Sequence, residues 1–355
     1  MTAIAFSAST CSSLSDFLQK AGSLIHHEIM GLIPEQEPKK FLYDLMRDYP
    51  SRGGKKFRSA LVLLSCEWFG GTISDALSSA VAFELFQNFA LIHDDIEDDS
   101  LSRRGKPTLH RLHGIPLALN AGDTMLELVY EVLLANEKQL GSSLTIQVLK
   151  HFNAVARHTF EGQAMDIGWV VHDIFPSKQE YQEMIKRKTG WYSGKGPSQC
   201  GAMIGKASVE AVECIGQFGE AIGIGFQARD DVLNLITDSE AEAPEANTGG
   251  YGKERGGDFA EGKRTLITIE MFDRLSGDDA KQLHQILLKP REQTNDGEIE
   301  WAIMQAEQSG ALEAVIAYCK EYAEVAKHCL DVLPNHPVKD LMQELVAYLT
   351  IERNF

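Results

Sequence analysis

The chain has 355 residues, of which 44% are hydrophobic and 24% are charged, as is ordinary for a globular protein. Its formal net charge of -17 disfavours nucleic acid as a partner, because phosphates repel an acidic surface. The six cysteines are scattered without a CxxC pair, which favours free thiols in a reducing compartment over disulfides or a zinc site.

The N-terminal stretch MTAIAFSASTCSS lacks the features of a secretory or transit signal. No run approaches the roughly 20 apolar residues that a membrane-spanning helix needs. We therefore expect a cytoplasmic protein with no membrane span. Residues 1–12 are expected to be disordered, and residues 13–355 to form a single domain, since no linker divides them.

Long stretches between the prolines carry apolar residues three or four positions apart, which is the helical signature. In residues 77–96 the series is Leu77, Val81, Leu85, Phe89 and Ile92. A similar pattern fills residues 117–136, and alternating strand-like runs are scarce. The sequence predicts an all-α protein with roughly ten or more helices.

Acidic residues are concentrated in LIHDDIEDDSLSRRG, at the end of the first of these helices. Asp94 and Asp98 are four residues apart and share a helical face, with Asp95 beside them. Like charges at this spacing destabilise an isolated helix by about 0.2–0.5 kcal/mol per pair. A bound cation removes that cost, and Mg²⁺ held by carboxylates and substrate phosphates is the natural candidate.

A second motif repeats this spacing in GIGFQARDDVLNLITD, where Asp230 and Asp231 are followed by Asn234. Either motif alone is a weak signal, because acidic helix ends are usually solvated. Two such faces across a cavity could hold a diphosphate through a cluster of Mg²⁺ ions.

Basic residues also occur in four short islands beside glycines, where the backbone can approach an anion closely. One island alone is most simply an exposed turn, but four interleaved with two acidic motifs indicate phosphate binding. The islands contain Arg52, Lys55, Lys56 and Arg58; Arg103, Arg104 and Lys106; Lys186, Arg187 and Lys188; and Lys253, Arg255, Lys263 and Arg264. Lys253 and Arg255 of the last island fall in the irregular stretch 237–262, whose glycine-rich half we expect near the chemistry.

The ordered motifs GGKKFR, DDIEDDSLSRRG, GQAMDI, KTG, FQARDDVLN and GDFAEGKRT resemble those of the trans-isoprenyl diphosphate synthases, also called polyprenyl synthetases. The resemblance covers roughly residues 40–270. It implies an all-α isoprenoid synthase bundle around a central cavity, usually a homodimer. The implied reaction is Mg²⁺-dependent head-to-tail condensation of isopentenyl diphosphate with an allylic diphosphate, with three Mg²⁺ ions per active site.

The resemblance also assigns roles to individual residues. Those implied to bind metal are Asp94, Asp95, Asp98, Asp230, Asp231 and Asn234, the last an amide where the family often has a third acid. Those implied to bind the two diphosphates are Lys55, Arg58, Gln87, Arg103, Arg104, Lys253 and Lys263. Lys188, Thr189 and Gln227 are implied to be catalytic: Lys188 holds the allylic diphosphate, and Thr189 and Gln227 line the site where the cation forms. Gln163 and Asp166 are implied to lie nearby.

Product length in this family depends on bulk along the helix before the first acidic motif. Phe89 lies five residues before Asp94 and Phe86 eight before it, about 7.5 and 12 Å away at 1.5 Å per residue. This arrangement resembles geranylgeranyl diphosphate synthases and points to a C20 product. Farnesyl (C15) and geranylfarnesyl (C25) products remain open, because aromatics at helical spacing are usually plain core residues.

Two other classes of protein fit part of the pattern. A class I terpene cyclase also ionises a prenyl diphosphate at an Asp-rich motif, but it needs no site for isopentenyl diphosphate. A non-catalytic partner subunit typically loses acids from the metal motifs, whereas here five of six positions are Asp.

Overall fold

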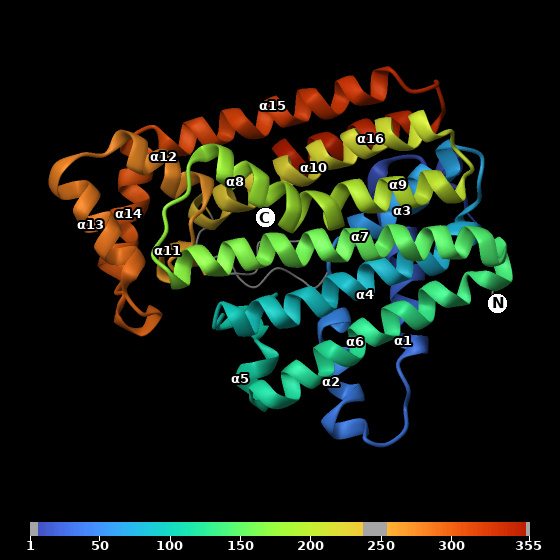
Figure 1. Cartoon of the computed structure of the whole chain (residues 1–355), viewed down its shortest axis with the longest axis horizontal. Coiled ribbons are helices and arrows are strands. Elements are labelled where there is room, and N and C mark those ends of the chain that lie inside the picture. The colour runs from blue at the N-terminus through green and yellow to red at the C-terminus, as the bar shows by residue number, and fades with distance from the viewer. Residues whose placement is uncertain (1–5, 237–253, 353–355) are drawn as a thin grey trace.

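The structure is a computed structural model, and it describes residues 6–236 and 254–352. In these residues nearly all regular structure is helical (Figure 1). The helices of the first half are α1 (Leu14–Leu32), α2 (Tyr43–Ser51), α3 (Phe57–Trp68), α4 (Ile73–Glu97), α5 (Leu109–His113), α6 (Ile115–Ala135) and α7 (Glu137–Val171). Those of the second half are α8 (Lys178–Ile185), α9 (Gly196–Ile204), α10 (Val209–Ile236), α11 (Gly257–Ala260), α12 (Leu266–Arg274), α13 (Gly277–Leu288), α14 (Asp296–Gln308), α15 (Ala311–Asp331) and α16 (Val338–Ala347).

Shorter elements connect these helices. A two-stranded antiparallel hairpin, β1 (Ser102–Arg103) and β2 (Lys106–Pro107), follows α4. The 3₁₀ turns are η1 (Ala8–Thr10), η2 (Lys39–Phe41) and η4 (Arg291–Gln293), and the π-helical segments are η3 (Lys186–Lys195) and η5 (Tyr348–Glu352). The predicted all-α class is confirmed.

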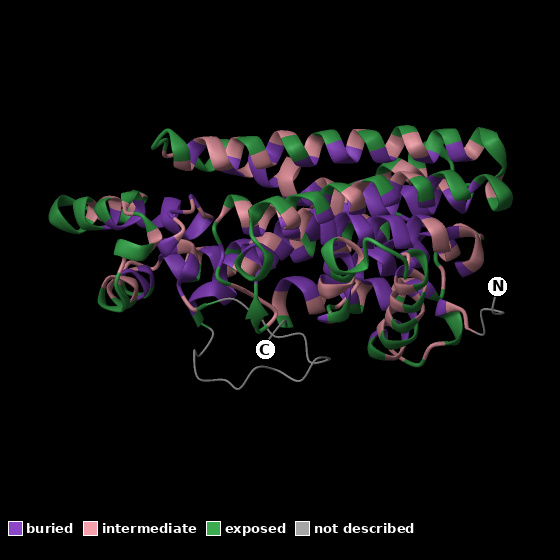
Figure 2. Ribbon diagram, turned by 90° about the horizontal axis from the view of Figure 1, so that it is seen from below, coloured by how far each residue is buried: buried purple, intermediate pink, exposed green. Residues whose placement is uncertain are grey.

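Helix α4 is the central element of the bundle and carries the first acidic motif at its end. It begins at a capping box in which Thr72 and Asp75 exchange hydrogen bonds. Its apolar residues are buried around most of the circumference, as expected for a helix surrounded by others. Figure 2 shows that buried residues fill the middle of the molecule and exposed residues cover its outer helices. The predicted helix over 77–96 falls within α4, and the one over 117–136 matches α6 except for residue 136, which lies just beyond its end.

The described residues bury two clusters of apolar side chains. The larger lies mainly among α1–α7, α9, α10 and α16, and the smaller lies among α8, α10, α12, α14 and α15. Helix α10 contributes to both, for example through Ile222 to the larger cluster and Val232 to the smaller. It therefore links the two halves and ends at the second acidic motif.

Residues 6–12, which we expected to be disordered, contact the helices that follow them; residues 1–5 lie outside the described part. Ala8 is buried, and its backbone N–H donates to Glu67 Oε2 at 2.6 Å. The Phe6 ring packs against Phe17, with centroids 6.2 Å apart. These tertiary contacts order a segment that has little helical signal of its own. Within residues 6–236 and 254–352, none of the helices has the length and apolar character needed to cross a membrane.

Candidate active site

A cavity of about 570 Å³ lies where α4, α7, η3 and α10 approach one another. This volume is typical of sites for small molecules. Its lining combines carboxylates, lysines, arginines and apolar side chains, so it suits a ligand with an anionic head and an apolar tail.

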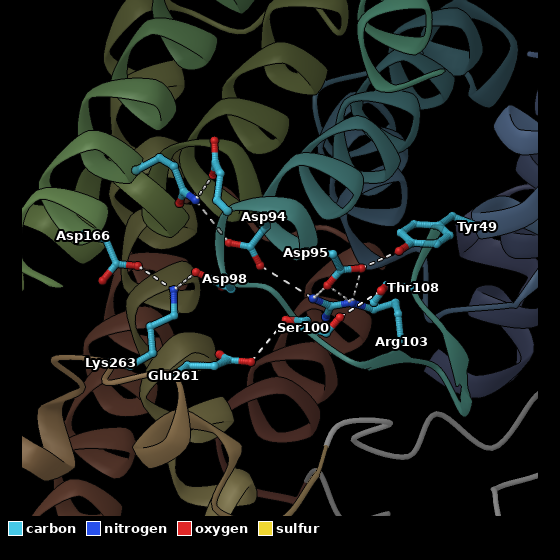
Figure 3. A network of polar contacts seen from close by, with 12 residues as sticks. Tyr49, Asp94, Asp95, Asp98, Ser100, Arg103, Thr108, Asp166, Glu261 and Lys263 are labelled. Atoms are coloured by element: carbon cyan, nitrogen blue, oxygen red, sulfur yellow. Dashed lines mark hydrogen bonds and ion pairs between the residues drawn. The ribbon is translucent and has the colours of Figure 1, made fainter. Parts of the chain in front are cut away.

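The last two turns of α4 place the acids of the first motif in different environments. Asp94 and Asp98 line the cavity, as their shared helical face predicts. Asp95 does not line it: it is fully buried and accepts hydrogen bonds from Tyr49 Oη at 2.5 Å and Arg103 Nε at 3.0 Å (Figure 3). Neighbouring helical residues point about 100° apart, which turns Asp95 away from the cavity. The position of Asp95 therefore does not fit the predicted role of metal ligand.

Arg103 reaches the cavity lining from strand β1. It forms a bidentate ion pair with Asp95, and Nη2 lies 3.6 Å from Asp94. Burial alone would lower the pKa of Arg103, but Asp95 and Asp94 outweigh it and raise the pKa. Asp95 thus holds a permanent cation beside Asp94 and so serves the site indirectly.

Two lysines stand among the cavity acids. Lys263 Nζ, from the loop between α11 and α12, lies 2.5 Å from Asp98 and 3.4 Å from Asp166 of α7 (Figure 3). Lys188 Nζ of η3 lies 2.5 Å from Asp166 and 3.5 Å from Asp94. Burial alone would raise the pKa of Asp166, but the two lysines outweigh it and lower the pKa to about 2. These five groups, three carboxylates and two lysines, form one ion-pair network that can exchange partners when a ligand enters.

The end of α10 supplies the second motif. Asp230 and Asp231 line the cavity. Asp231 is buried and accepts from Tyr181 Oη at 2.8 Å and Gln227 Nε2 at 3.1 Å. Burial raises the pKa of Asp231 to about 6, although these hydrogen bonds oppose the shift. Gln227 also accepts from Thr189 Oγ1 at 3.0 Å, which joins the two residues predicted beside the allylic cation.

Asn234 is placed differently from its prediction as a metal ligand. It is fully buried and is not among the cavity-lining residues. Its Oδ1 accepts from the Asp258 backbone at 3.3 Å, and its Nδ2 donates to the Glu254 carbonyl at 3.5 Å. One turn beyond Asp230, this side chain holds the segment that leads into α11.

The residues present fit Mg²⁺ bound together with a diphosphate. In residues 6–236 and 254–352, no three His, Cys, Asp or Glu side chains form a ready-made metal cage. Mg²⁺ rarely needs one, because it takes one or two carboxylates and completes its shell with substrate phosphates and water. Asp94 and Asp98 on one wall and Asp230 on the other are donors of this kind.

The π-helical form of η3 positions Lys188 and Thr189. Short π-helical segments are rare and occur frequently at functional sites. Gly194 of η3 packs directly on α10, since a Cβ atom there would lie 1.8 Å from the Gly219 carbonyl oxygen. This backbone contact fixes η3 against the helix that carries the second acidic motif.

A second polar region of the cavity is basic and contains the predicted residues Lys55, Arg58, Gln87 and Arg104. Arg58 donates to Ser193 Oγ at 2.7 Å, and its guanidinium lies over the Tyr192 ring. Arg104 donates to the Tyr49 carbonyl at 3.1 Å and to that of Gly53. Burial lowers the pKa of Arg104 to about 10. The predicted Lys253 lies outside the described residues.

Of the two aromatic residues predicted to limit product length, only one lines the cavity. Phe89 lines the cavity, whereas Phe86 is fully buried behind it, with ring centroids 5.5 Å apart. Phe160 of α7, which the sequence analysis missed, also lines the cavity. It lies three residues before Gln163 on the same face of α7, but only the packing of α7 against α4 brings it to the cavity.

Comparisons with known proteins agree with this geometry. Geranylgeranyl pyrophosphate synthase of Geoglobus acetivorans is 33% identical over 96% of this chain and 99% of the relative. Geranylfarnesyl diphosphate synthase of Natronomonas pharaonis is 29% identical over 94% of this chain and 95% of the relative. The crystal structure of geranylgeranyl pyrophosphate synthetase from Pyrococcus horikoshii superposes with a TM-score of 0.83 at 32% identity, covering 96% of this chain and 98% of that one. A model of the family described as polyprenyl synthetase matches residues 39–306, and the chain belongs to that family.

Proposed function

We propose that this protein is a Mg²⁺-dependent isoprenyl diphosphate synthase that makes all-trans geranylgeranyl diphosphate. One observation carries the proposal: an acidic wall and a basic wall line the same cavity, so two diphosphates can be held side by side. The acidic wall holds the allylic substrate through metal ions, and the basic wall holds isopentenyl diphosphate directly. The relatives named as geranylgeranyl synthases support the C20 product.

The chain's residues prepare the allylic diphosphate for ionisation. Asp94, Asp98 and Asp230 are the ligands available to metal, and Lys188 and Lys263 can turn from their carboxylate partners to the diphosphate oxygens. When bound, Mg²⁺ would supply Lewis-acid stabilisation of the leaving diphosphate. The C1–O bond then breaks, and the electron pair leaves with pyrophosphate.

The second substrate is oriented by the basic wall. Lys55, Arg58 and Arg104 bind its diphosphate, which points the double bond at the allylic carbon. Thr189 and Gln227, joined by their hydrogen bond, offer oxygen dipoles to the cation. A C–C bond forms, and a proton is lost to the departing pyrophosphate. The apolar lining keeps water from the cation.

We further propose a homodimer in the cytoplasm. Leu112 of α5 and Ile115, Leu119 and Leu134 of α6 are exposed apolar residues on adjacent helices. Such a row is suited to an interface between copies. All six cysteines are free thiols, which suits a reducing compartment. Light scattering of purified protein tests the dimer, and a monomer that does not change with concentration would contradict it.

A product assay tests the proposed reaction. Purified protein receives Mg²⁺, labelled isopentenyl diphosphate and, separately, C5, C10 and C15 allylic diphosphates, and the dephosphorylated alcohols are sized. A dominant C20 alcohol supports the proposal. A C15 or C25 alcohol would support the enzyme class but contradict the proposed C20 product. The geranylfarnesyl diphosphate synthase among the relatives makes C25 an alternative to test. Cyclic hydrocarbon formed from an allylic diphosphate alone would indicate a terpene cyclase. The absence of any product would indicate a non-catalytic subunit.

A further inference from the structure

The apolar end of the cavity contains an aromatic pair contributed by two different helices. Phe89 of α4 and Phe160 of α7 meet edge to face, with centroids 5.9 Å apart and ring planes at 89°. Both line the cavity that holds the acidic motifs. We propose that Phe160 is a product-length determinant and forms with Phe89 the wall that stops the growing prenyl chain. This inference rests on the proposed synthase function.

The position of Phe160 follows from the way α4 and α7 run side by side (Figure 1). Asp94 of α4 accepts a hydrogen bond from Gln163 of α7 at 3.3 Å. Closer to the C-terminal ends of both helices, Lys263 forms ion pairs with Asp98 of α4 and Asp166 of α7. In the opposite direction the next pair is Phe89 and Phe160. Residue numbers increase together on both helices, so the helices are parallel and each pair lies at one depth.

The pairs between α4 and α7 change from polar to apolar with increasing distance from the acidic motif. The pairs that involve Asp98 and Asp94 are polar and face the diphosphate end, whereas the Phe89–Phe160 pair is the first that is wholly apolar. Phe160 lies six residues before Asp166, about 9 Å along the helix axis. A tail that leaves the metal-binding end therefore meets two rings, one from each helix, before it reaches the core behind them.

The two rings differ in how firmly they are held. Phe89 is 4% exposed, and its ring also contacts His93, whose Nε2 lies 3.3 Å from Asp123. Phe160 is 44% exposed although it lines the cavity. Replacing Phe160 removes less buried surface than replacing Phe89 would, so we expect the fold to tolerate changes at Phe160 better.

Phe86 has a different role in this arrangement. Its ring is fully buried, 5.5 Å from Phe89 and 6.0 Å from Phe160, and it packs edge to face against Phe152. It supports both rings from behind and does not reach the cavity lining. Phe86 is thus a positioning residue, and Phe160 is the second residue that the tail touches.

The test compares product lengths of the wild-type protein with those of Phe160→Ala and Phe160→Trp. Isopentenyl diphosphate is supplied in excess over a C15 primer, and the alcohols are resolved by chain length. Phe160→Ala is expected to convert most of the product from the wild-type length to chains at least one C5 unit longer. Phe160→Trp is expected to shift product toward shorter chains. Phe89→Ala provides the comparison for the other ring of the wall.

Val171→Ala is the matched control, because Val171 is an exposed apolar residue on the same helix and outside the cavity lining. It should leave the product distribution unchanged. Unchanged product length in folded Phe160→Ala and Phe160→Trp, with Phe89→Ala lengthening the product, would overturn the inference and leave the synthase intact. Absence of elongation by the wild-type protein would instead refute the proposed function. If Phe160→Ala does not fold, Phe160→Leu and Phe160→Trp test the same effect on product length.

Discussion

Lys263 and Asp98, both in the cavity lining, meet at 2.5 Å although 165 positions separate them in the chain. The contact joins the loop between α11 and α12 to the end of α4. It also places a cation where a metal-bound diphosphate is proposed to lie. The lysines of the site therefore pair with its acids until a ligand takes both as partners.

Metal and diphosphate should therefore stabilise the protein cooperatively. Mg²⁺ alone must displace lysines from the carboxylates, and pyrophosphate alone must approach those carboxylates. We expect the rise in Tm with both ligands to exceed the sum of the two separate rises. Differential scanning fluorimetry after chelation measures this, with Asp98→Asn as the variant that should lose the excess. Strictly additive rises would argue against a shared site.

The acids of DDIEDD should fall into separate functional groups. Asp94→Asn and Asp98→Asn remove cavity carboxylates and should lower kcat by about 100-fold or more. Asp99→Asn is the matched control, because Asp99 is exposed and pairs with Arg111 at the surface. It should change kcat by less than about twofold, as expected for a surface ion pair. Equal losses in all three variants would show that the cavity geometry does not decide the roles.

Asp166→Asn should destabilise the protein in a pH-dependent way. It leaves Lys188 and Lys263 buried with one counter-charge fewer, at a cost of about 3–5 kcal/mol. The folded pKa of about 2 lies below the ordinary value of 3.8, so this stabilisation is complete above that value and is lost as pH falls toward 2.

Urea unfolding of wild-type protein and Asp166→Asn between pH 8 and pH 3 checks this prediction. The difference in unfolding free energy should be constant from pH 8 to about pH 5 and shrink below about pH 4. A difference that grows on acidification would contradict the assigned ion pairs.

Gly54→Ala should weaken the basic wall. Gly54 has a φ of +125°, and a Cβ atom would lie 2.7 Å from Arg104 Nη2. The backbone strain alone costs about 1–3 kcal/mol. We expect a higher KM for isopentenyl diphosphate, with a smaller change in the KM for the allylic substrate. Gly31→Ala is the control, since a Cβ atom there meets nothing within 4 Å. An effect confined to the allylic KM would place Arg104 at the other substrate.

The helices and the shared face of Asp94 and Asp98 could be predicted from local spacing, whereas the roles of the other site residues were implied by the family resemblance. The four-residue interval of Asp94 and Asp98 sets a common face wherever the helix lies. The orientations of Asp95 and Asn234 could not be predicted, since they depend on tertiary partners such as Tyr49 and the Asp258 backbone. Phe160 was missed for the same reason, because only the packing of α7 against α4 brings it to Phe89.

The central claim is that one cavity holds two diphosphates side by side and joins their prenyl groups, so one pyrophosphate should be released for each condensation. Pyrophosphate release measures this directly. The C15 allylic diphosphate is incubated with enzyme and Mg²⁺, with and without isopentenyl diphosphate, and released pyrophosphate is compared with C20 product. We predict one pyrophosphate for each condensation and little release when isopentenyl diphosphate is omitted. Rapid release from the allylic substrate alone, without a longer diphosphate product, would contradict the account and favour a cyclase.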